Sequence, residues 1–324
     1  MSSIVRGSLF ASLCALLIAP AAAAADTYPE RPIRLIVPFS PGGGTDINAR
    51  ILAEPMGNAL GTTIVVDNRP GAGSLIGCDI AAKSTPDGYT LLMGTISLAV
   101  NTAVYKKMPF NAQYDLAPIT RVSDQPSILV VHPSFPAKSF KDFVALTHTQ
   151  PGKFTFGTPG YGTGSHLATE MLMLKIGSDL VHVPFKGTGP ALVALLSDQI
   201  TVFVSTFASA LPHVKQHRLL AYAVTTRTRA GPLPDVPTLA EEGVKDYEYA
   251  SWYGLFAPAG TPRAIIDKVH KAAIDSLKSP DVMRVYEEQG LNAIPTTPAE
   301  FARYIASEVR KWAGVVGAAR IAQQ

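Results

Sequence analysis

Short apolar runs alternate with helical patterns along nearly the whole chain beyond residue 26, and this alternation constrains the fold most. The candidate strands are runs of four to seven residues bounded by turn-forming residues: 33–39, 63–67, 90–93, 128–132, 154–157, 180–184, 201–205, 219–224 and 252–257. Strands that alternate with helices are typical of an α/β protein with largely parallel sheets. We therefore predict the α/β class.

The helical patterns between these runs place apolar residues three or four positions apart. Ile47, Ile51 and Met56 form one such set, and the last 60 residues are predicted to be helical only. In that region one apolar face repeats at helical spacing, formed by Phe301, Ile305, Val309, Trp312 and Val316. Spacings of three and four residues predict one buried face of a long helix.

Residues 1–25 have the pattern of a cleaved export signal. Arg6 gives the positive start, residues 9–18 give a short apolar core, and 21–25 are alanines ending before Asp26. A run of ten residues, nine of them apolar, is too short to cross a bilayer, which needs about 20. An uncleaved anchor is the alternative. We expect an exported mature protein.

Composition limits the remaining function classes. Removing residues 1–25 leaves 299 of 324 residues, which suits two compact lobes better than one core. Without Arg6 the balance is 27 basic against 25 acidic residues, and no basic run interleaves with aromatics, so we expect no nucleic-acid partner. Cys78 is the one cysteine left, lies on an apolar helical pattern, and is predicted to pack in the core.

Two proline-bounded segments look like connections between lobes, at residues 125–136 and 252–262. If both cross, lobe one comprises residues 26–127 plus 252–324, and lobe two comprises 128–251. A two-strand hinge of this kind suits a clamp that closes on a ligand in the cleft.

Three glycine-rich turns each follow a predicted strand and precede a predicted helix. They span residues 41–46, 68–74 and 157–166. A helix start offers up to four unpaired N–H groups and a partial positive charge, and glycine lets backbone approach a ligand closely. One such turn alone is more often a plain connection. Three turns, assigned to both lobes, favour a carboxylate site that needs no basic side chain.

Motifs for other chemistry are missing. The glycine turns match neither GxGxxG nor GxxxxGK[ST], and no G-x-S-x-G, H-E-x-x-H or C-x-x-C occurs. His213 and His217 have ligand-like spacing, but no carboxylate pattern completes a metal site. A hydrolase that uses Ser165 with His166 or His182 is the enzymatic alternative, although His182 is better explained as a hydrogen-bonded structural residue. We expect no catalysis, no metal and no cofactor.

Short sequence blocks occur in a fixed order along essentially the whole mature chain, at residues 28–29, 31–33, 36–39, 42–46, 68–73, 86–91, 160–164, 166–168, 182–187, 234–238 and 258–262. In these blocks the chain resembles the Bug (TctC-like) extracytoplasmic receptors of tripartite tricarboxylate transporters.

The resemblance implies a periplasmic-binding-protein fold of type II, two α/β lobes with a cleft between them, and a ligand held mainly by backbone N–H groups and water. It further implies capture of a small carboxylate in the periplasm and delivery to two membrane subunits; we expect a monomer. A periplasmic sensor module is the alternative. The expected ligand-binding residues are Phe39, Pro41, Gly42, Gly43, Gly44, Thr45, Asp46, Gly71, Ala72, Gly73, Ser74, Gly160, Thr163, Gly164, Ser165, His166 and Ser205.

Two departures from the family pattern bear on the ligand. Ser74 stands where relatives usually have a glycine, and Ser205 aligns where they often have an aspartate. Such an acid could meet the ammonium of an amino acid. Ser205 therefore favours a ligand without an amine: a dicarboxylate, a tricarboxylate or an aromatic acid.

Overall fold

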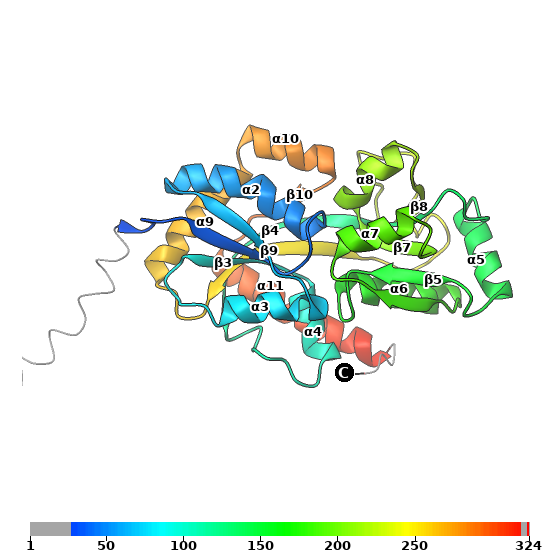
Figure 1. Ribbon diagram of the computed structural model, residues 1–324, viewed down its shortest axis with the longest axis horizontal. Coiled ribbons are helices and arrows are strands. Elements are labelled where there is room, and N and C mark those ends of the chain that lie inside the picture. Colours follow the sequence, from blue (N-terminus) through cyan, green and yellow to red (C-terminus); the bar gives the residue numbers. More distant parts are fainter. Residues whose placement is uncertain (1–26, 319–322, 324) are drawn as a thin grey trace, which may run out of the picture.

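The computed structural model describes residues 27–318 and residue 323, and there the strands form one mixed sheet in the order β2-β1-β3-β9-β4-β7-β5-β6, with β8 and β10 also paired to β4 (Figure 1). The strands are β1 (Ile33–Val37), β2 (Ile64–Asn68), β3 (Thr90–Thr95), β4 (Leu116–Val131), β5 (Thr155–Thr158), β6 (Val181–Pro184), β7 (Val202–Thr206), β8 (Leu220–Val224), β9 (Ala250–Pro258) and β10 (Asn292–Ala293).

The helices follow the strands through the glycine turns and other short loops. They are α2 (Gly44–Leu60), the 3₁₀ turn η1 (Ala72–Ser74), α3 (Leu75–Ala82), α4 (Ser97–Val104), α5 (Phe140–Thr149), α6 (Gly164–Ile176), α7 (Thr188–Leu196), α8 (Phe207–Lys215), α9 (Arg263–Leu277), α10 (Pro280–Gln289) and α11 (Pro298–Ala318).

The long strand β4 joins the two ends of the sheet. Its residues 116–126 pair with β9, and its residues 127–131 pair with β7 and β8. We call β1–β3, β9, β10 and the first part of β4 the first half, and the rest of the sheet the second half. Just before β9, the Tyr249 N–H donates to the Thr225 carbonyl at 2.9 Å, so that β9 is also tied to the second half.

The outer strands of each half are parallel, as their helical connections require. The central strands β4 and β9 are antiparallel to each other and to the outer strands that they pair with. The prediction of largely parallel pairing therefore describes the outer strands. The lobe boundaries at residues 127 and 252 stay a prediction, and β4 runs across the first of these positions without a break.

Helices cover both faces of the sheet, which buries its strands on both sides. In the first half, α2, α9 and α10 cover one face while α3, α4 and α11 cover the other; in the second half, α7 and α8 lie opposite α5 and α6 (Figure 1). Cys78 is fully buried in α3, in the core region that its pattern predicted.

The C-terminal region is helical except at one point. The predicted apolar face of α11 is confirmed, because Phe301, Ile305, Trp312 and Val316 are buried. The prediction of helices only is wrong at β10, whose two residues pair with Ser123 and Asp124 of β4. Two residues are too short for a sequence pattern to reveal. The predicted export signal lies outside the described residues, and none of the described helices combines the length and hydropathy needed to span a membrane.

Candidate functional site

A small pocket of about 40 Å³ lies between the two halves of the sheet. Both halves line it, through Phe39, Gly43, Gly44, Thr45, Thr95, Ile96, Ser97, Pro159, Thr163, Gly164, Ser165, Thr188, Thr206, Tyr249, Ser251 and Tyr253. Because both halves contribute lining residues, a ligand bound in this pocket would contact both halves. Such a ligand would stabilise one relative arrangement of the two halves.

Five helices begin at this pocket. The first residues of α2, α4, α6 and α7, and the residue that precedes α8, are among its lining residues. Each helix start carries unpaired N–H groups and the positive end of the helix dipole. Their convergence gives the pocket a positive potential from backbone alone.

Several of these N–H groups have no protein acceptor. In the described part of the chain, no hydrogen bond is formed by the N–H groups of Gly44 and Thr45 in α2, or of Gly164 and Ser165 in α6. Buried backbone donors are normally paired. Four unpaired donors at one pocket, two from each half, indicate a site for a ligand that accepts hydrogen bonds.

Among the described residues, no charged side chain lines the pocket. Ten of the sixteen lining residues instead carry a hydroxyl group. A cationic ligand would find no carboxylate in this lining to balance its charge, and leaving a buried charge unpaired is costly. The lining therefore suits an anion bound by N–H and O–H donors.

Gly44 and Gly164 are glycines because of close packing at the two helix starts. A Cβ on Gly44 would lie 2.3 Å from both Gln125 Nε2 and Tyr253 Oη, and a Cβ on Gly164 would lie 2.4 Å from Tyr249 Oη. The start of α2 therefore packs directly against the Tyr253 hydroxyl, and the start of α6 packs directly against the Tyr249 hydroxyl.

The floor of the pocket comes from β9 and the residue before it. Tyr249, Ser251 and Tyr253 are two positions apart, and alternate residues of an extended segment point to the same side. The hydroxyls of Tyr249 and Ser251 lie 2.9 Å apart. Burial raises the pKa of both tyrosines above the usual range, so these phenols stay protonated and can donate.

Of the first predicted turn, Gly43, Gly44 and Thr45 line the pocket, as does Phe39 just before it. Pro41 and Gly42 of this turn lie against Gly189 of the second half. Asp46 turns away and holds the turn together. Its Oδ2 accepts from the Gly42 N–H and from Arg50 Nε, both at 3.0 Å, and its Oδ1 accepts from Asn68.

Asp46 stays ionised in this position. Burial acts to raise its pKa, but the hydrogen bonds from Arg50, the Gly42 N–H and Asn68 outweigh burial and hold the pKa below its usual value. The carboxylate thus fixes the backbone of the turn that leads into α2, rather than binding a ligand itself.

The second predicted turn, residues 68–74, does not line the pocket. The Asn101 side-chain amide donates to the Gly73 carbonyl at 3.0 Å, and Gly73 packs against the Tyr161 carbonyl of the second half. A Cβ on Gly73 would be 2.1 Å from that oxygen. This turn forms a contact between the two halves beside the pocket, as does Ser40, whose N–H and Oγ both donate to the Lys186 carbonyl.

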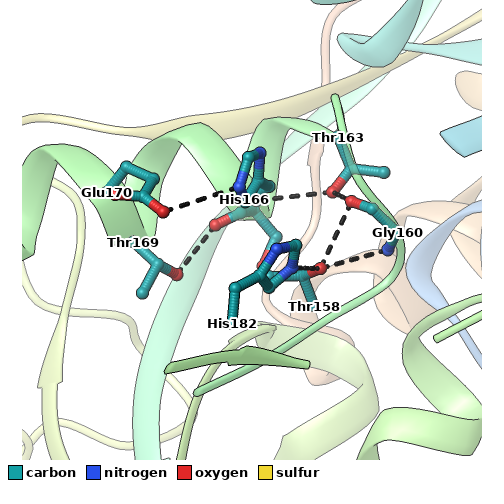
Figure 2. Close-up of polar contacts among 8 residues, drawn as sticks. Thr158, Gly160, Thr163, His166, Thr169, Glu170 and His182 are labelled. Atoms are coloured by element: carbon teal, nitrogen blue, oxygen red, sulfur yellow. Dashed lines mark hydrogen bonds and ion pairs between the residues drawn. The ribbon is translucent and has the colours of Figure 1, made fainter. Parts of the chain in front are cut away.

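The third predicted turn divides in a similar way. Thr163, Gly164 and Ser165 line the pocket, whereas Gly160 and His166 do not. Figure 2 shows the hydroxyls of Thr158 and Thr163 meeting at the Gly160 carbonyl, at 3.2 and 2.7 Å. Thr163 also caps α6 by accepting from the His166 N–H. These contacts fix the turn that presents the start of α6.

Two histidines pack behind this turn. The rings of His166 and His182 stack at 4.3 Å, and Thr158 Oγ1 lies 2.6 Å from His182 Nε2 (Figure 2). Burial and the neighbouring His166 lower the pKa of His182 to about 4, against the opposing effect of Glu170. His182 is neutral at ordinary pH, in keeping with a structural role.

The two candidate serines are held by backbone. Ser165 Oγ donates to the Val204 carbonyl at 2.6 Å, and Ser205 Oγ donates to the Thr206 carbonyl. A nucleophilic serine must hand its proton to a base. The Ser165 hydroxyl instead donates its hydrogen bond to a backbone carbonyl. Neither histidine serves as its base, because His182 is hydrogen-bonded to Thr158 and His166 lies 3.6 Å from Glu170. Ser205 is fully buried next to Thr206 and does not itself line the pocket.

Sequence reasoning missed the rest of the lining. The residues missed are Thr95, Ile96, Ser97, Pro159, Thr188, Thr206, Tyr249, Ser251 and Tyr253. The alternation of 249, 251 and 253 was a usable signal, had the predicted strand begun at 249 rather than 252. The starts of α4 and α8 carry no glycine run, so nothing in their local sequence marked them.

A family model and several known proteins match this chain. The family model described as the tripartite tricarboxylate transporter family receptor, TctC, matches residues 48–320. The chain belongs to this family. Its members are solute-binding receptors, not enzymes, so the hydrolase alternative is set aside and the predicted family is confirmed.

Similar proteins align with about nine-tenths of the chain. Protein BugT of Bordetella pertussis is 38% identical over 90% of each chain. Among solved structures, the periplasmic binding protein BugD is 33% identical with a TM-score of 0.89, covering 92% of this chain and 100% of that one. Rpa4515 of R. palustris, solved with adipate, is 31% identical with a TM-score of 0.89 over 92% and 100% of the two chains. MatC of Rhodopseudomonas palustris, solved with bound malate, is 30% identical with a TM-score of 0.85 over 89% and 100%. The predicted periplasmic-binding-protein fold is confirmed by these neighbours.

Proposed function

We propose that this receptor captures a small organic carboxylate in the pocket between the two halves, within the periplasm, and delivers it to two membrane subunits of a tripartite tricarboxylate transporter. The observation that carries the proposal is the set of four unpaired N–H groups, from Gly44, Thr45, Gly164 and Ser165, in a described lining without charged side chains. Anions bind at helix starts through such groups.

The composition of the lining supports an acid without an amine. Neither an aspartate nor a glutamate is among the described lining residues to meet an ammonium group, and Ser205 stands beside the pocket where an acid would be needed. A dicarboxylate, a tricarboxylate or an aromatic acid is the ligand class that we propose. Relatives solved with adipate and with malate are consistent with this class.

The pocket volume supports a hinge motion on binding. A cavity of about 150 Å³ holds benzene, which has six carbon atoms. The volume here is about 40 Å³, too small for a dicarboxylate such as adipate or malate. Binding therefore requires the halves to separate from the arrangement described, with β4 and β9 as the connecting strands. The bound acid would then stabilise whichever arrangement closes around it, by its stronger affinity for that state.

A thermal-shift screen of the mature protein tests the ligand class. Adipate, malate, citrate and benzoate are compared with aspartate and with the neutral diamide of adipic acid. At 100 times its dissociation constant a ligand adds about 2.7 kcal/mol to the free energy of unfolding. We expect a clear rise in melting temperature with at least one amine-free acid. Stabilisation by aspartate alone would overturn the ligand class, and stabilisation by no acid would overturn carboxylate capture.

Delivery to a transporter is tested separately. Vesicles that contain the two membrane subunits should take up the selected acid when the receptor is supplied on their periplasmic face, and should not when it is omitted. Uptake that is independent of the receptor would contradict the proposed partnership.

A further inference from the structure

Gln125 connects the crossing strand β4 to the pocket floor. The side chain is fully buried, and its backbone pairs with Ser251 of β9. Gln125 Oε1 accepts from the N–H of Ala208, at the start of α8, at 3.1 Å, and Gln125 Nε2 donates to Tyr253 Oη. One amide side chain thus links the second half, the crossing strand and a pocket hydroxyl.

These partners fix the orientation of the amide. A backbone N–H can only donate, so the amide oxygen must face Ala208 and the NH₂ group must face Tyr253. The Tyr253 oxygen is therefore an acceptor toward Gln125. Its own proton has to point elsewhere, toward the pocket or toward Ser251, which in turn bonds Tyr249.

The same hydroxyl lies directly under the start of α2. A Cβ on Gly44 would come within 2.3 Å of both Tyr253 Oη and Gln125 Nε2. The phenol and the unpaired N–H groups of Gly44 and Thr45 therefore share one corner of the site. A donor O–H there adds to those N–H groups, whereas an acceptor oxygen would oppose them.

We propose that Gln125 is a positioning residue that makes Tyr253 a hydrogen-bond donor within the pocket and thereby selects for a bound anion. The inference rests on the proposed capture of a carboxylate. It concerns a side chain outside the pocket lining, which acts through Tyr253.

The ionisable groups near this amide come from two strands. Tyr253 and Tyr249 belong to β9 and the residue before it, and the neighbouring Asp124 on β4 is paired with Arg121 at 2.9 Å. Gly44 of α2 and Ala208 of α8, which pack against the amide, are uncharged. The pKa of a carboxyl introduced at position 125 would thus be set by the two phenols and the Asp124–Arg121 pair.

Gln125→Glu is the principal test, because glutamate has nearly the same shape. The carboxylate still accepts a hydrogen bond from the Ala208 N–H. Toward Tyr253, however, a carboxylate cannot donate as the amide does, so Tyr253 must donate to it and the phenol proton turns away from the pocket. Once protonated, the introduced carboxyl can donate to Tyr253 and restores the original polarity. Calorimetry with adipate and with malate, from pH 5 to 8, gives the affinity of each variant relative to wild type.

We expect Gln125→Glu to bind the acid roughly 10- to 100-fold more weakly at pH 8, the size of one hydrogen bond to a charged group, with most of this deficit recovered at pH 5. A deficit that is constant with pH would overturn the proposal, since mere loss of packing does not titrate.

Gln125→Met and Tyr253→Phe provide controls without a new charge. Each should weaken binding by a similar, pH-independent factor. The double variant should be no weaker than either single one, because both changes remove the same donor. Additive losses would contradict action through Tyr253, and this comparison decides the matter even if Gln125→Glu fails to fold.

A measurement without ligand separates this inference from the proposed function. If wild type binds neither acid, carboxylate capture fails, and the pKa of the carboxyl introduced by Gln125→Glu, followed by carbon NMR, still tests the contact. We expect that pKa to rise when Tyr253→Phe is added to Gln125→Glu, because a donor to the carboxylate is lost. An unchanged pKa would show that the two side chains do not interact.

Discussion

Gly44→Ala probes the start of α2 with the smallest possible change. The new Cβ would lie 2.3 Å from Gln125 Nε2 and from Tyr253 Oη. That distance is about 1.2 Å shorter than an ordinary contact of roughly 3.5 Å. Both neighbours are buried in the packed region between β4 and β9, so one of them, or the start of α2, must move.

The magnitude follows from two opposing effects on stability. Overpacking of this kind costs about 1–3 kcal/mol, and alanine in place of glycine regains up to about 1 kcal/mol in a helix. The net loss of about 0–3 kcal/mol corresponds to a fall in melting temperature of up to roughly 10 °C. The variant should therefore fold.

Binding should suffer far more than folding. The methyl group must displace the Tyr253 hydroxyl, the Gln125 amide or the start of α2, and each of these shifts misplaces a hydrogen-bond donor of the pocket. Each hydrogen bond to a charged group contributes about 1.5–3 kcal/mol, so the loss of one lowers affinity roughly 10- to 100-fold. Calorimetry with the tightest acid from the screen measures this loss.

A matched variant separates the site from helix propensity. Gly314 lies in α11, exposed, with no atom within 4 Å of an added Cβ. Gly314→Ala should leave affinity unchanged and raise stability slightly. If Gly44→Ala bound the acid within threefold of wild type while keeping its fold, the assignment of α2 to the site would be refuted.

Contacts elsewhere in the fold make three further predictions. Because the folded-state pKa of His182 is about 4, against 6.5 for a free histidine, the unfolded chain binds more protons between these values; the free energy of unfolding should fall as pH drops through this window, and His182→Gln should flatten the slope in urea titrations. Equal slopes would contradict the structural role of His182. Glu308 accepts from the indoles of Trp252 and Trp312, both at 3.1 Å, so Glu308→Ala should lower stability by about 2–5 kcal/mol without changing affinity; a selective loss of affinity would be inconsistent with this anchoring role. Ser165→Ala removes the bond to the Val204 carbonyl, and should cost about 1 kcal/mol in stability; any esterase turnover that this variant abolished would revive the enzymatic alternative.

The strands that were predicted best from sequence are those with short, uninterrupted apolar runs. β2, β5, β6, β7 and β8 lie within one residue of their predicted limits. The first part of β4 was missed because Arg121, Ser123 and Asp124 interrupt its apolar pattern. In the fold these polar residues are satisfied by partners outside the local pattern; Ser123, for example, donates to Asn48 of α2 at 2.6 Å.

The site was predictable to the extent that glycine marks a helix start. The turns before α2 and α6 carry glycines, and parts of both line the pocket. The starts of α4 and α8 and the β9 floor were not predicted, since their position depends on how β4 and β9 cross. That crossing is a tertiary arrangement, which local sequence patterns do not predict.

The most direct test of carboxylate recognition is calorimetry of the wild-type protein with adipate and with adipamide, its neutral diamide of almost equal shape. If helix starts and hydroxyl donors hold an anion, adipate should bind at least 100-fold more tightly than adipamide, a difference of about 2.7 kcal/mol. The same comparison with malate and malamide covers a shorter acid. Equal affinity for an acid and its diamide would contradict recognition of the carboxylate by these backbone donors.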